Sequence, residues 1–313
     1  MTHNDLSEQS KDLLFELNRS SLGDAVISCL QAILPEDSET SPETIIGYLR
    51  SESEELSTPY YLKESPYDAI YEPEALLKHH LAEGWPASTG FRIPITVIPD
   101  WSKYQSKSRS VRYKIHAWDM LDLLLRVDSL DPKIETLNLA IDIADDWIVK
   151  YIISTQQDDF AWYDMGVGQR ATKLSYMIRR LIQINADSDL ILRFILAAQI
   201  HFSELTDIER IATHRNHGLF QIAGLISLSK NLPWMLKSEP ATKFAESVLK
   251  QILSEHFSED GLHLEHSPGY HLFMAVHLSF LNDSGWLSNE FDSLSDFIMD
   301  VANAADWMAT PEM

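Results

Sequence analysis

The chain has 313 residues, of which 45% are hydrophobic and 10% aromatic, so it can bury a sizeable core and is not generally disordered. Its formal net charge of −22 argues against wholesale binding to nucleic acid or to an anionic membrane, although a local basic groove is compatible with it. One cysteine excludes an internal disulfide, and no stretch approaches the roughly 20 apolar residues that span a bilayer, so we expect a cytoplasmic protein without a membrane span.

The first hundred residues predict short helices joined by loops rich in proline, and we assign residues 1–100 to an N-terminal helical and loop-rich extension. The lone cysteine, Cys29, lies in an apolar stretch and is expected to fill the core. Residues 91–99 alternate and are β-branched, but prolines near both ends favour an edge strand or extended segment over a sheet. The helices are predicted over residues 5–18, 22–34, 44–53 and 72–81.

From residue 114 the apolar spacing stays helical, which predicts eight helices with short connections and a second domain over residues 101–313. Helix pairs in regular succession form a bundle, a solenoid or a closed toroid. No short internal repeat is visible, which counts against a simple solenoid. The helices are predicted over residues 115–127, 134–154, 170–184, 189–205, 219–229, 239–257, 270–281 and 290–308.

Two polar clusters, residues 214–218 and 265–271, lie in turns that connect these helices. They combine an amide, several imidazoles and a phenol, which offer hydrogen-bond donors and a proton shuttle without an obvious nucleophile. This combination suits proton abstraction better than hydrolysis. His263, His266 and His271 together offer three imidazoles, but their spacing fits no strong zinc signature, so we expect no metal.

Basic residues are concentrated in the middle of the chain. Residues 101–215 contain 15 of the 25 lysines and arginines against 16 acidic residues, whereas both flanks are strongly acidic. Within this segment Trp162 and Tyr163 precede Arg170, and sugars stack on aromatic rings while carboxylates pair with arginine. The alternatives are a random surface distribution, a core role for Trp162, and a solvated helix terminus at Arg170.

The two clusters carry a resemblance to a known family. Asn216-His217-Gly218, a helix pair and then Glu265-His266-Ser267-Pro268-Gly269-Tyr270-His271 resemble the helical half of the heparinase II/III polysaccharide lyases and related alginate lyases. Ala161-Trp162-Tyr163-Asp164, Gly168-Gln169-Arg170-Ala171 and the start of the helical run at Tyr113-Lys114-Ile115-His116-Ala117-Trp118 are similar to that family as well. The resemblance covers about residues 100–310.

The resemblance implies an all-α fold, an incomplete (α/α) toroid that in the family precedes a C-terminal antiparallel β-sandwich. Because the chain stops at Met313, we expect the sandwich to be absent from it and to be a missing partner domain. The family cleaves uronic-acid-containing polysaccharides by β-elimination, and a histidine from the sandwich completes its site. This chain alone is therefore expected to bind glycan weakly and to turn over little.

The resemblance also implies the site residues. Tyr270 matches the family's catalytic tyrosine, and Asn216 with His217 is the candidate group that neutralises the substrate carboxylate and stabilises the enolate-like intermediate. An acidic polysaccharide is the expected partner, and no cofactor is implied. The residues predicted to bind substrate are Trp162, Tyr163, Arg170, Arg215, His266 and His271.

Other interpretations stay open at this point. Asn216 is also a suitable N-cap for the following helix, Tyr270 can start a helix and pack its ring, and each histidine taken singly is more often structural. A glycoside hydrolase would need paired carboxylates, for which Glu265 and Asp164 are the candidates. A third possibility is a non-catalytic glycan-binding or assembly protein. For a lyase, the lack of an export signal favours an intracellular role in exopolysaccharide metabolism.

Overall fold

The computed structural model describes residues 11, 41–54, 56, 59–62, 72–235, 238–264, 267–287 and 292–308. The helix predicted over residues 22–34, with Cys29, lies outside the described residues, as does nearly all of the helix predicted over 5–18. Glu265 and His266 of the second polar cluster also lie outside them.

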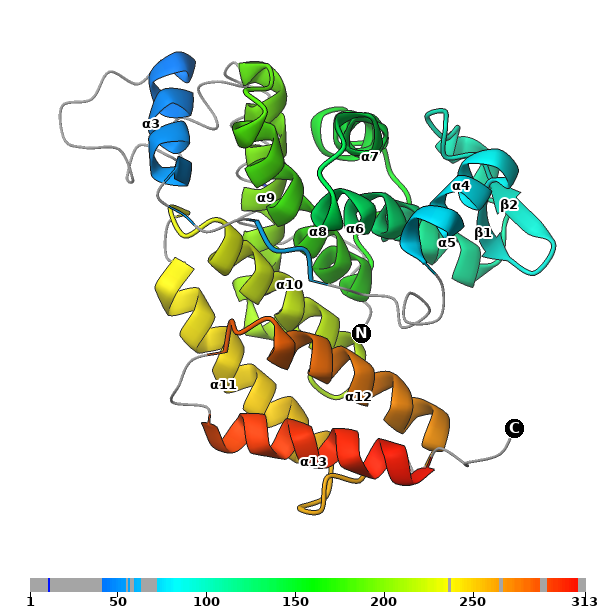
Figure 1. Ribbon diagram of the computed structural model, residues 1–313, viewed down its shortest axis with the longest axis vertical. Helices are drawn as coiled ribbons and strands as arrows, with labels where there is room; N and C mark the ends of the chain where they lie inside the picture. The colour runs from blue at the N-terminus through cyan, green and yellow to red at the C-terminus, as the bar shows by residue number, and fades with distance from the viewer. Residues whose placement is uncertain are drawn as a thin grey trace.

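The described chain is almost entirely helical (Figure 1). Short 3₁₀ helices occupy Trp101–Tyr104, Asp119–Leu121 and Ile208–Arg210, and a π-helix over Val149–Ile153 extends one of the α-helices. The α-helices are α3 (Pro42–Glu54), α4 (Pro73–Glu83), α5 (Arg109–His116), α6 (Asp122–Leu130), α7 (Ile134–Ile148), α8 (Asp164–Gln183), α9 (Ser188–Thr206), α10 (His217–Asn231), α11 (Ser238–His256), α12 (Pro268–Asp283) and α13 (Asp292–Met308).

Four antiparallel helix pairs, α6–α7, α8–α9, α10–α11 and α12–α13, follow one another through the structure (Figure 1). The first helices of successive pairs pack together, as α6 on α8 and α8 on α10. The second helices also pack together, as α7 on α9 and α9 on α11. This layered succession is an incomplete α/α toroid, which confirms the fold class predicted from the sequence.

The pairing places one set of connecting loops at one end of the toroid. Because each pair runs up and down, every loop that leads from a second helix to the next first helix lies at the same end. The described residues of these loops are 154–163, 207–216, 257–264 and 267. The first polar cluster runs from the second loop into the start of α10, the described residues 267–271 of the second cluster lead into α12, and Trp162 and Tyr163 are in the first loop.

Two glycines allow α8 and α10 to touch through their backbones. A Cβ added to Gly168 would meet the carbonyl oxygen of Phe220 at 2.3 Å, and one added to Gly224 would meet the carbonyl oxygen of Gly168 at 2.3 Å. A side chain at either position would overlap the backbone of the other helix. Glycine at both positions therefore allows α8 and α10 to cross in direct backbone contact.

The predicted boundaries differ from the structure in the first part of the toroid. The helix predicted over residues 115–127 is broken at Trp118, whose φ of 61° ends α5 and starts the turn into α6. Helix α8 begins at Asp164, before the predicted start at residue 170, because Gly166 and Gly168 are helical rather than part of a loop. The other toroid helices lie where the apolar spacing predicts them.

A small β-hairpin precedes the toroid and corrects the expectation of no sheet. Strand β1 (Trp85–Ser88) pairs antiparallel with β2 (Phe91–Ile93), with Trp85 opposite Ile93 and a bulge between Pro86 and Ser88. Gly90, with a φ of 73°, closes the turn, and Pro94 follows only after the last paired residue. The prolines therefore limit the hairpin to a few residues but do not prevent it.

The described helices before the toroid pack against its first two pairs. Helix α3 lies on α8 and α9, and α4 lies on α6 and β1. The described helices of the N-terminal extension therefore pack on the toroid. In the described part of the chain, no helix combines the length and apolar character that crossing a membrane requires.

Candidate functional site

A cavity of about 300 Å³ opens at the end of the toroid that carries the loops between successive helix pairs. Its volume is at the lower end of the roughly 300–1,000 Å³ typical of small-molecule sites. It lies between the start of α8, the end of α9, the 207–216 loop and α10. The lining residues are Trp162, Asp164, Val167, Glu204, Glu209, Arg210, Ile211, Ala212, His214, Arg215 and Gln221.

The 207–216 loop is held in place by contacts with α9, α10 and α11. Gln221 accepts a hydrogen bond from the backbone N–H of Ala212 and donates one to the carbonyl of Arg210, each at 2.9 Å. Arg210 and Glu204 form an ion pair at 2.7 Å with both side chains mostly buried. His256 of α11 donates to the carbonyl of Thr213 at 2.7 Å. The loop that leads to Asn216 is therefore rigidly placed.

His217 and Asp164 form a hydrogen-bonded pair beside the cavity, which Asp164 lines. Nδ1 of His217 donates to Oδ1 of Asp164 at 3.0 Å, with both side chains partly exposed. Burial alone would raise the pKa of Asp164, but the hydrogen bond and charge of His217, the N–H of Met165 and the charge of Arg215 outweigh it and lower the pKa. A carboxylate that stays charged orients the imidazole and leaves Nε2 available for proton transfer.

Asn216 occupies the N-cap position of α10, but its side chain makes no capping hydrogen bond. It is half-buried, and its amide is therefore available to a ligand. Arg215 beside it is exposed, and its charge acts on Asp164 without a close ion pair to it among the contacts of the described residues. An amide and an exposed guanidinium next to a histidine are groups that can bind a carboxylate and the charge that develops on it.

Tyr270 lies in the first turn of α12 and is 50% exposed, so its ring does not fill the core. Phe220, one turn into α10, contacts Phe273, one turn into α12, with ring centroids 5.6 Å apart. The starts of α10 and α12 are therefore neighbours at the same end of the toroid, which places Asn216 and Tyr270 on the same side. Tyr270 is not among the residues that line the cavity, and its catalytic role stays a prediction.

Four residues that we expected on the groove surface are buried: Trp162 and Tyr163 are each 9% exposed, and Trp162 belongs to the hydrophobic core as its alternative interpretation proposed. Arg170 is fully buried and His271 is 1% exposed, so neither side chain can touch a polysaccharide in this structure. His271 accepts from the N–H of His263 through Nδ1 and donates from Nε2 to the carbonyl of Val301 on α13, which gives it a structural role in the turn below Tyr270. Arg170 is likewise not the solvated helix terminus that was considered.

Arg170 is enclosed by aromatic rings. Its Nε donates to Nε2 of His201 at 3.0 Å, and Nη1 donates to the carbonyl of His116 at 2.6 Å. The guanidinium lies 4.2 Å from the ring centroid of Trp147 and 5.5 Å from that of Trp162. Burial lowers the pKa of Arg170 to about 9. The guanidinium of Arg170 therefore packs against the ring of Trp162, which lines the cavity.

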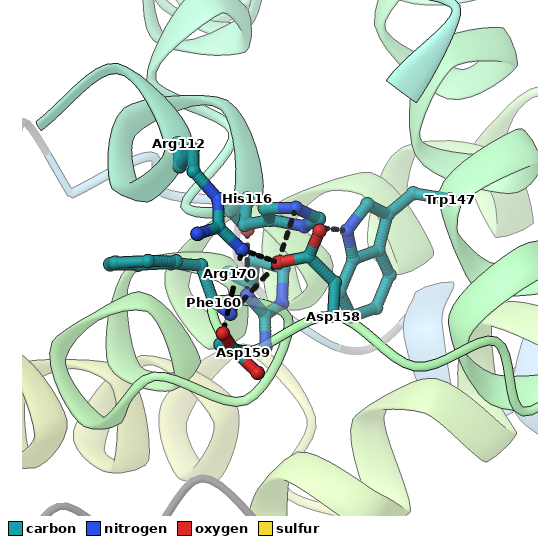
Figure 2. A network of polar contacts seen from close by, with 7 residues as sticks. All are labelled: Arg112, His116, Trp147, Asp158, Asp159, Phe160 and Arg170. Atoms are coloured by element: carbon teal, nitrogen blue, oxygen red, sulfur yellow. Dashed lines mark hydrogen bonds and ion pairs between the residues drawn. The ribbon is translucent and has the colours of Figure 1, made fainter. Parts of the chain in front are cut away.

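A second buried network fixes the 154–163 loop, as Figure 2 shows. Asp158 accepts from Arg112 at 3.0 Å and from the N–H of Phe160 at 3.0 Å, and lies 3.4 Å from Nε2 of His116. Burial would raise the pKa of Asp158, but His116, the N–H of Phe160 and Arg112 lower it well below its usual range. Trp147 donates to Nδ1 of His116 at 3.1 Å, so His116 carries its proton on Nε2.

Tyr163 connects this loop to the candidate catalytic residues. Its hydroxyl accepts from Arg109 at 3.1 Å, and its ring contacts those of His217 and Tyr113 with centroids 5.5 Å and 5.6 Å apart. The hydroxyl of Tyr113 in turn donates to Oε1 of Gln169. Tyr163 is thus in contact with His217, and its predicted role in substrate binding stays a prediction.

The sequence did not identify His116, Asp158 or His201 as part of the site. Each lies in a different element, and only the packing of α5, the 154–163 loop, α8 and α9 brings them together. In the sequence, Asp158 is one acidic residue of a predicted loop, and no local pattern marks it as buried. Among the described residues, no group of three or more histidine, cysteine or acidic side chains is arranged to hold a metal ion.

Comparison with known proteins identifies the fold. The chain resembles the heparan sulfate lyase HepC from Pedobacter heparinus, with 17% identity and a TM-score of 0.60 over 93% of this chain and 46% of that one. It also resembles a heparinase III, the BT4657 gene product with methylated lysines, with 15% identity and a TM-score of 0.59 over 96% of this chain and 49% of that one. The chain thus spans about half the length of these structures.

Sequence comparison points the same way. No curated protein matches the chain by sequence. The sequence model of the family described as Heparinase II/III N-terminus matches residues 141–310, which is more than half of the chain and includes both polar clusters. The chain therefore belongs to the heparinase II/III family.

Proposed function

We propose that this protein acts in the cleavage of a uronic-acid-containing acidic polysaccharide by β-elimination. The observation that carries the proposal is the group formed by Asn216, the His217–Asp164 pair and the exposed guanidinium of Arg215 beside a cavity that Trp162 helps to line. This group offers anion binding and proton transfer, and the mostly buried ring of Trp162 contributes an apolar part of the cavity wall.

The reaction requires each of these functions. A base removes the proton on C5 of the uronate, the resulting electron pair forms the C4–C5 double bond, and the C4–oxygen bond breaks. The leaving oxygen takes up a proton from an acid. Asn216 and Arg215 are placed to neutralise the carboxylate, which makes the C5 proton more acidic and stabilises the enolate-like intermediate. His217 and Tyr270 are the candidate groups for proton transfer.

The class of substrate follows from the family and the site together. HepC is described as a heparan sulfate lyase, and the proposal transfers only the broader class, a polysaccharide that contains uronic acid, to this chain. A free carboxylate on the sugar fits the side chains of Arg215 and Asn216. A hydrolase mechanism is less well supported, because Asp164, one of its two candidate carboxylates, is bound to His217.

The test follows two products at once in a panel of acidic polysaccharides. A lyase produces both new reducing ends and the ultraviolet absorbance of an unsaturated uronate, a hydrolase produces reducing ends only, and a binding protein produces neither. We expect both signals, at a low rate, with this chain, and we expect Asn216→Ala and Tyr270→Phe each to lower that rate further, by about 10²–10⁴-fold. Reducing ends without the absorbance, or full activity in both variants, would reject the proposal.

The replacement Ser254→Ala serves as the matched control. Ser254 is exposed on α11 and donates only to the carbonyl of Gln251 within its own helix, so its replacement tests whether any surface change affects the assay. We expect the activity of this variant to equal that of the wild type.

A further inference from the structure

A strongly basic surface segment lies outside the residues that the family model matches. Between residues 91 and 118 the chain carries six basic side chains and a single acidic one, in a protein whose net charge is −22. We call this segment, which includes β2, the 3₁₀ helix Trp101–Tyr104 and α5, the basic strip. Its basic residues are Arg92, Lys103, Lys107, Arg109, Arg112 and Lys114.

The exposed cations of the basic strip are not neutralised by neighbouring acids. The ammonium of Lys107 lies 4.4 Å above the ring of Phe91, which also packs edge-on against Tyr104. Arg109 donates to the hydroxyl of Tyr163. Within the described residues neither Lys107 nor Arg109 has a carboxylate partner, and both are exposed. Lys103 has only a solvent-exposed contact of 3.5 Å with Asp100, and such pairs are weak.

The basic strip is continuous with the candidate site. Arg109 bonds Tyr163, and the ring of Tyr163 contacts His217, so one exposed cation is a single residue away from the proposed catalytic group. Next to it, Arg112 stacks on Phe160 at 4.5 Å while it holds Asp158 (Figure 2). From there the strip leads to the hairpin, which Figure 1 shows grouped with α4 and α5 on one side of the molecule.

We propose that the exposed part of the basic strip, formed by Lys103, Lys107 and Arg109 with the ring of Phe91, is a second binding site for an anionic polysaccharide chain. A polymer whose one sugar occupies the cavity would continue over Tyr163 and Arg109 onto this surface. Its carboxylates or sulfates are attracted by these cations, of which Lys107 and Arg109 have no carboxylate partner among the described residues, and the half-buried ring of Phe91 holds the ammonium of Lys107 at this surface. The identity of the polymer rests on the proposed function, whereas the location of the site does not.

A polysaccharide fits this surface better than a nucleic acid does. The protein has a net charge of −22, and the surface around the basic strip is acidic on average. This surface repels a polyanion as densely charged as DNA. A uronate polymer carries less charge per length than duplex DNA, so this repulsion is weaker for it.

The experiment compares binding of the full chain to a uronate disaccharide, to polymeric alginate and heparan sulfate, and to single-stranded DNA. The double variant Lys107→Gln/Arg109→Gln removes two strip charges, and Lys243→Gln/Lys250→Gln removes two exposed charges on α11 as the matched control. We expect the strip variant to bind at least one of the two polysaccharides about three- to tenfold more weakly at low salt, with disaccharide binding unchanged, and the control to match the wild type. The difference between strip variant and wild type should shrink as salt is added.

The outcomes separate this site from the proposed function. Weaker polymer binding by the strip variant supports the second site even if the wild type cleaves nothing, which would reject the proposed function alone. Equal loss in the strip and control variants, unchanged polymer binding in the strip variant, or a wild type that binds neither polysaccharide would overturn the inference. Tighter binding of DNA than of either polysaccharide would overturn it as well, in favour of a nucleic-acid surface. Circular dichroism and thermal unfolding of both variants confirm that they are folded.

Discussion

Nε of Arg170 donates to Nε2 of His201 at 3.0 Å in an interior where both side chains are fully buried. His201 in turn donates from Nδ1 to the carbonyl of Ala197, so it is a neutral histidine in a fixed tautomer. An arginine is thus held in the core by a neutral imidazole, a carbonyl and the faces of tryptophan rings rather than by a carboxylate. This arrangement supports the Trp162 wall of the cavity.

The first prediction concerns the shape of the Arg170 side chain. A lysine at this position keeps the charge, but it cannot donate to both His201 and His116 or lie flat on Trp147. We expect Arg170→Lys to lower the free energy of unfolding by about 2–4 kcal/mol, measured by urea denaturation.

The same exchange at Arg193 is the control for this prediction. Arg193 also makes two hydrogen bonds, to Asp145, but both side chains are about one quarter exposed, and we expect a loss below about 1 kcal/mol. If Arg170→Lys and Arg193→Lys had equal effects, the enclosed geometry around Arg170 would not be responsible for its contribution to stability.

The second prediction is a pH dependence of stability that comes from His201. Burial, reinforced by the charge of Arg170, lowers the pKa of His201 well below its usual value of about 6.5. Between these two pKa values the unfolded chain binds a proton that the folded chain does not. The contribution of His201 to stability is therefore complete above about pH 6.5 and is lost as the pH falls below it, by about 1.4 kcal/mol per pH unit.

The variant His201→Gln removes this titrating group. We expect its stability relative to the wild type to improve steadily as the pH is lowered from about 7 to 5, measured by chemical denaturation at each pH. Phe194→Leu, which replaces another fully buried side chain of α9 but removes no titrating group, is the control, and its difference from the wild type should not change with pH. A constant difference between His201→Gln and the wild type over this range would contradict the assignment.

The sequence predicted most helices of the toroid well because their apolar residues recur at helical spacing, and in α7 and α11 these residues form one buried stripe. It did not predict the break at Trp118, since no local signal marks a tryptophan that adopts a positive φ under tertiary packing. It placed Gly166 and Gly168 in a loop, because the reason for glycine there is the backbone of α10, which is far away in the sequence.

In the candidate site, too, the sequence predicts the features that depend on the order of the helices but not those that depend on tertiary packing. The positions of Asn216 and Tyr270 at the starts of neighbouring helices follow from the order of helices and turns, which can be read from the sequence. Arg170 was expected on the surface because it follows Trp162 and a glycine-rich stretch. Helix α8 is buried on nearly all sides, so its sequence has no polar face from which the direction of Arg170 could be judged.

The third prediction tests the contact between α8 and α10. Gly168→Ala would place a methyl group 2.3 Å from the carbonyl oxygen of Phe220, and backbone on both sides prevents a local adjustment. We expect a loss of about 3 kcal/mol or more in the free energy of unfolding. Gly47→Ala in α3 is the matched control, because its added methyl group meets nothing within 4 Å.

Helix propensity predicts a gain of about 0.4–1 kcal/mol for the Gly47→Ala control, the opposite sign to Gly168→Ala. Thermal and urea unfolding of the two variants measure both effects. A neutral or stabilising result for Gly168→Ala would show that the two inner helices do not cross as closely as the structure places them.

The fourth prediction separates the charge of Asp164 from its hydrogen bond to His217. Asparagine at position 164 can still accept the bond from Nδ1, but it carries no negative charge to stabilise a protonated imidazole. If His217 transfers a proton during the proposed elimination, Asp164→Asn should lower kcat roughly 10- to 100-fold with little change in KM.

The variant Asp189→Asn, at the exposed start of α9, should leave both constants unchanged. NMR of isotope-labelled histidine provides a reading that does not depend on activity. The carboxylate of the wild type can only accept, so His217 should keep its proton on Nδ1, whereas the amide of Asp164→Asn can also donate to a deprotonated Nδ1 and so allows both tautomers. A wild-type kcat in Asp164→Asn, together with an unchanged tautomer, would remove the His217–Asp164 pair from the mechanism and leave Tyr270 as the remaining candidate for both proton transfers.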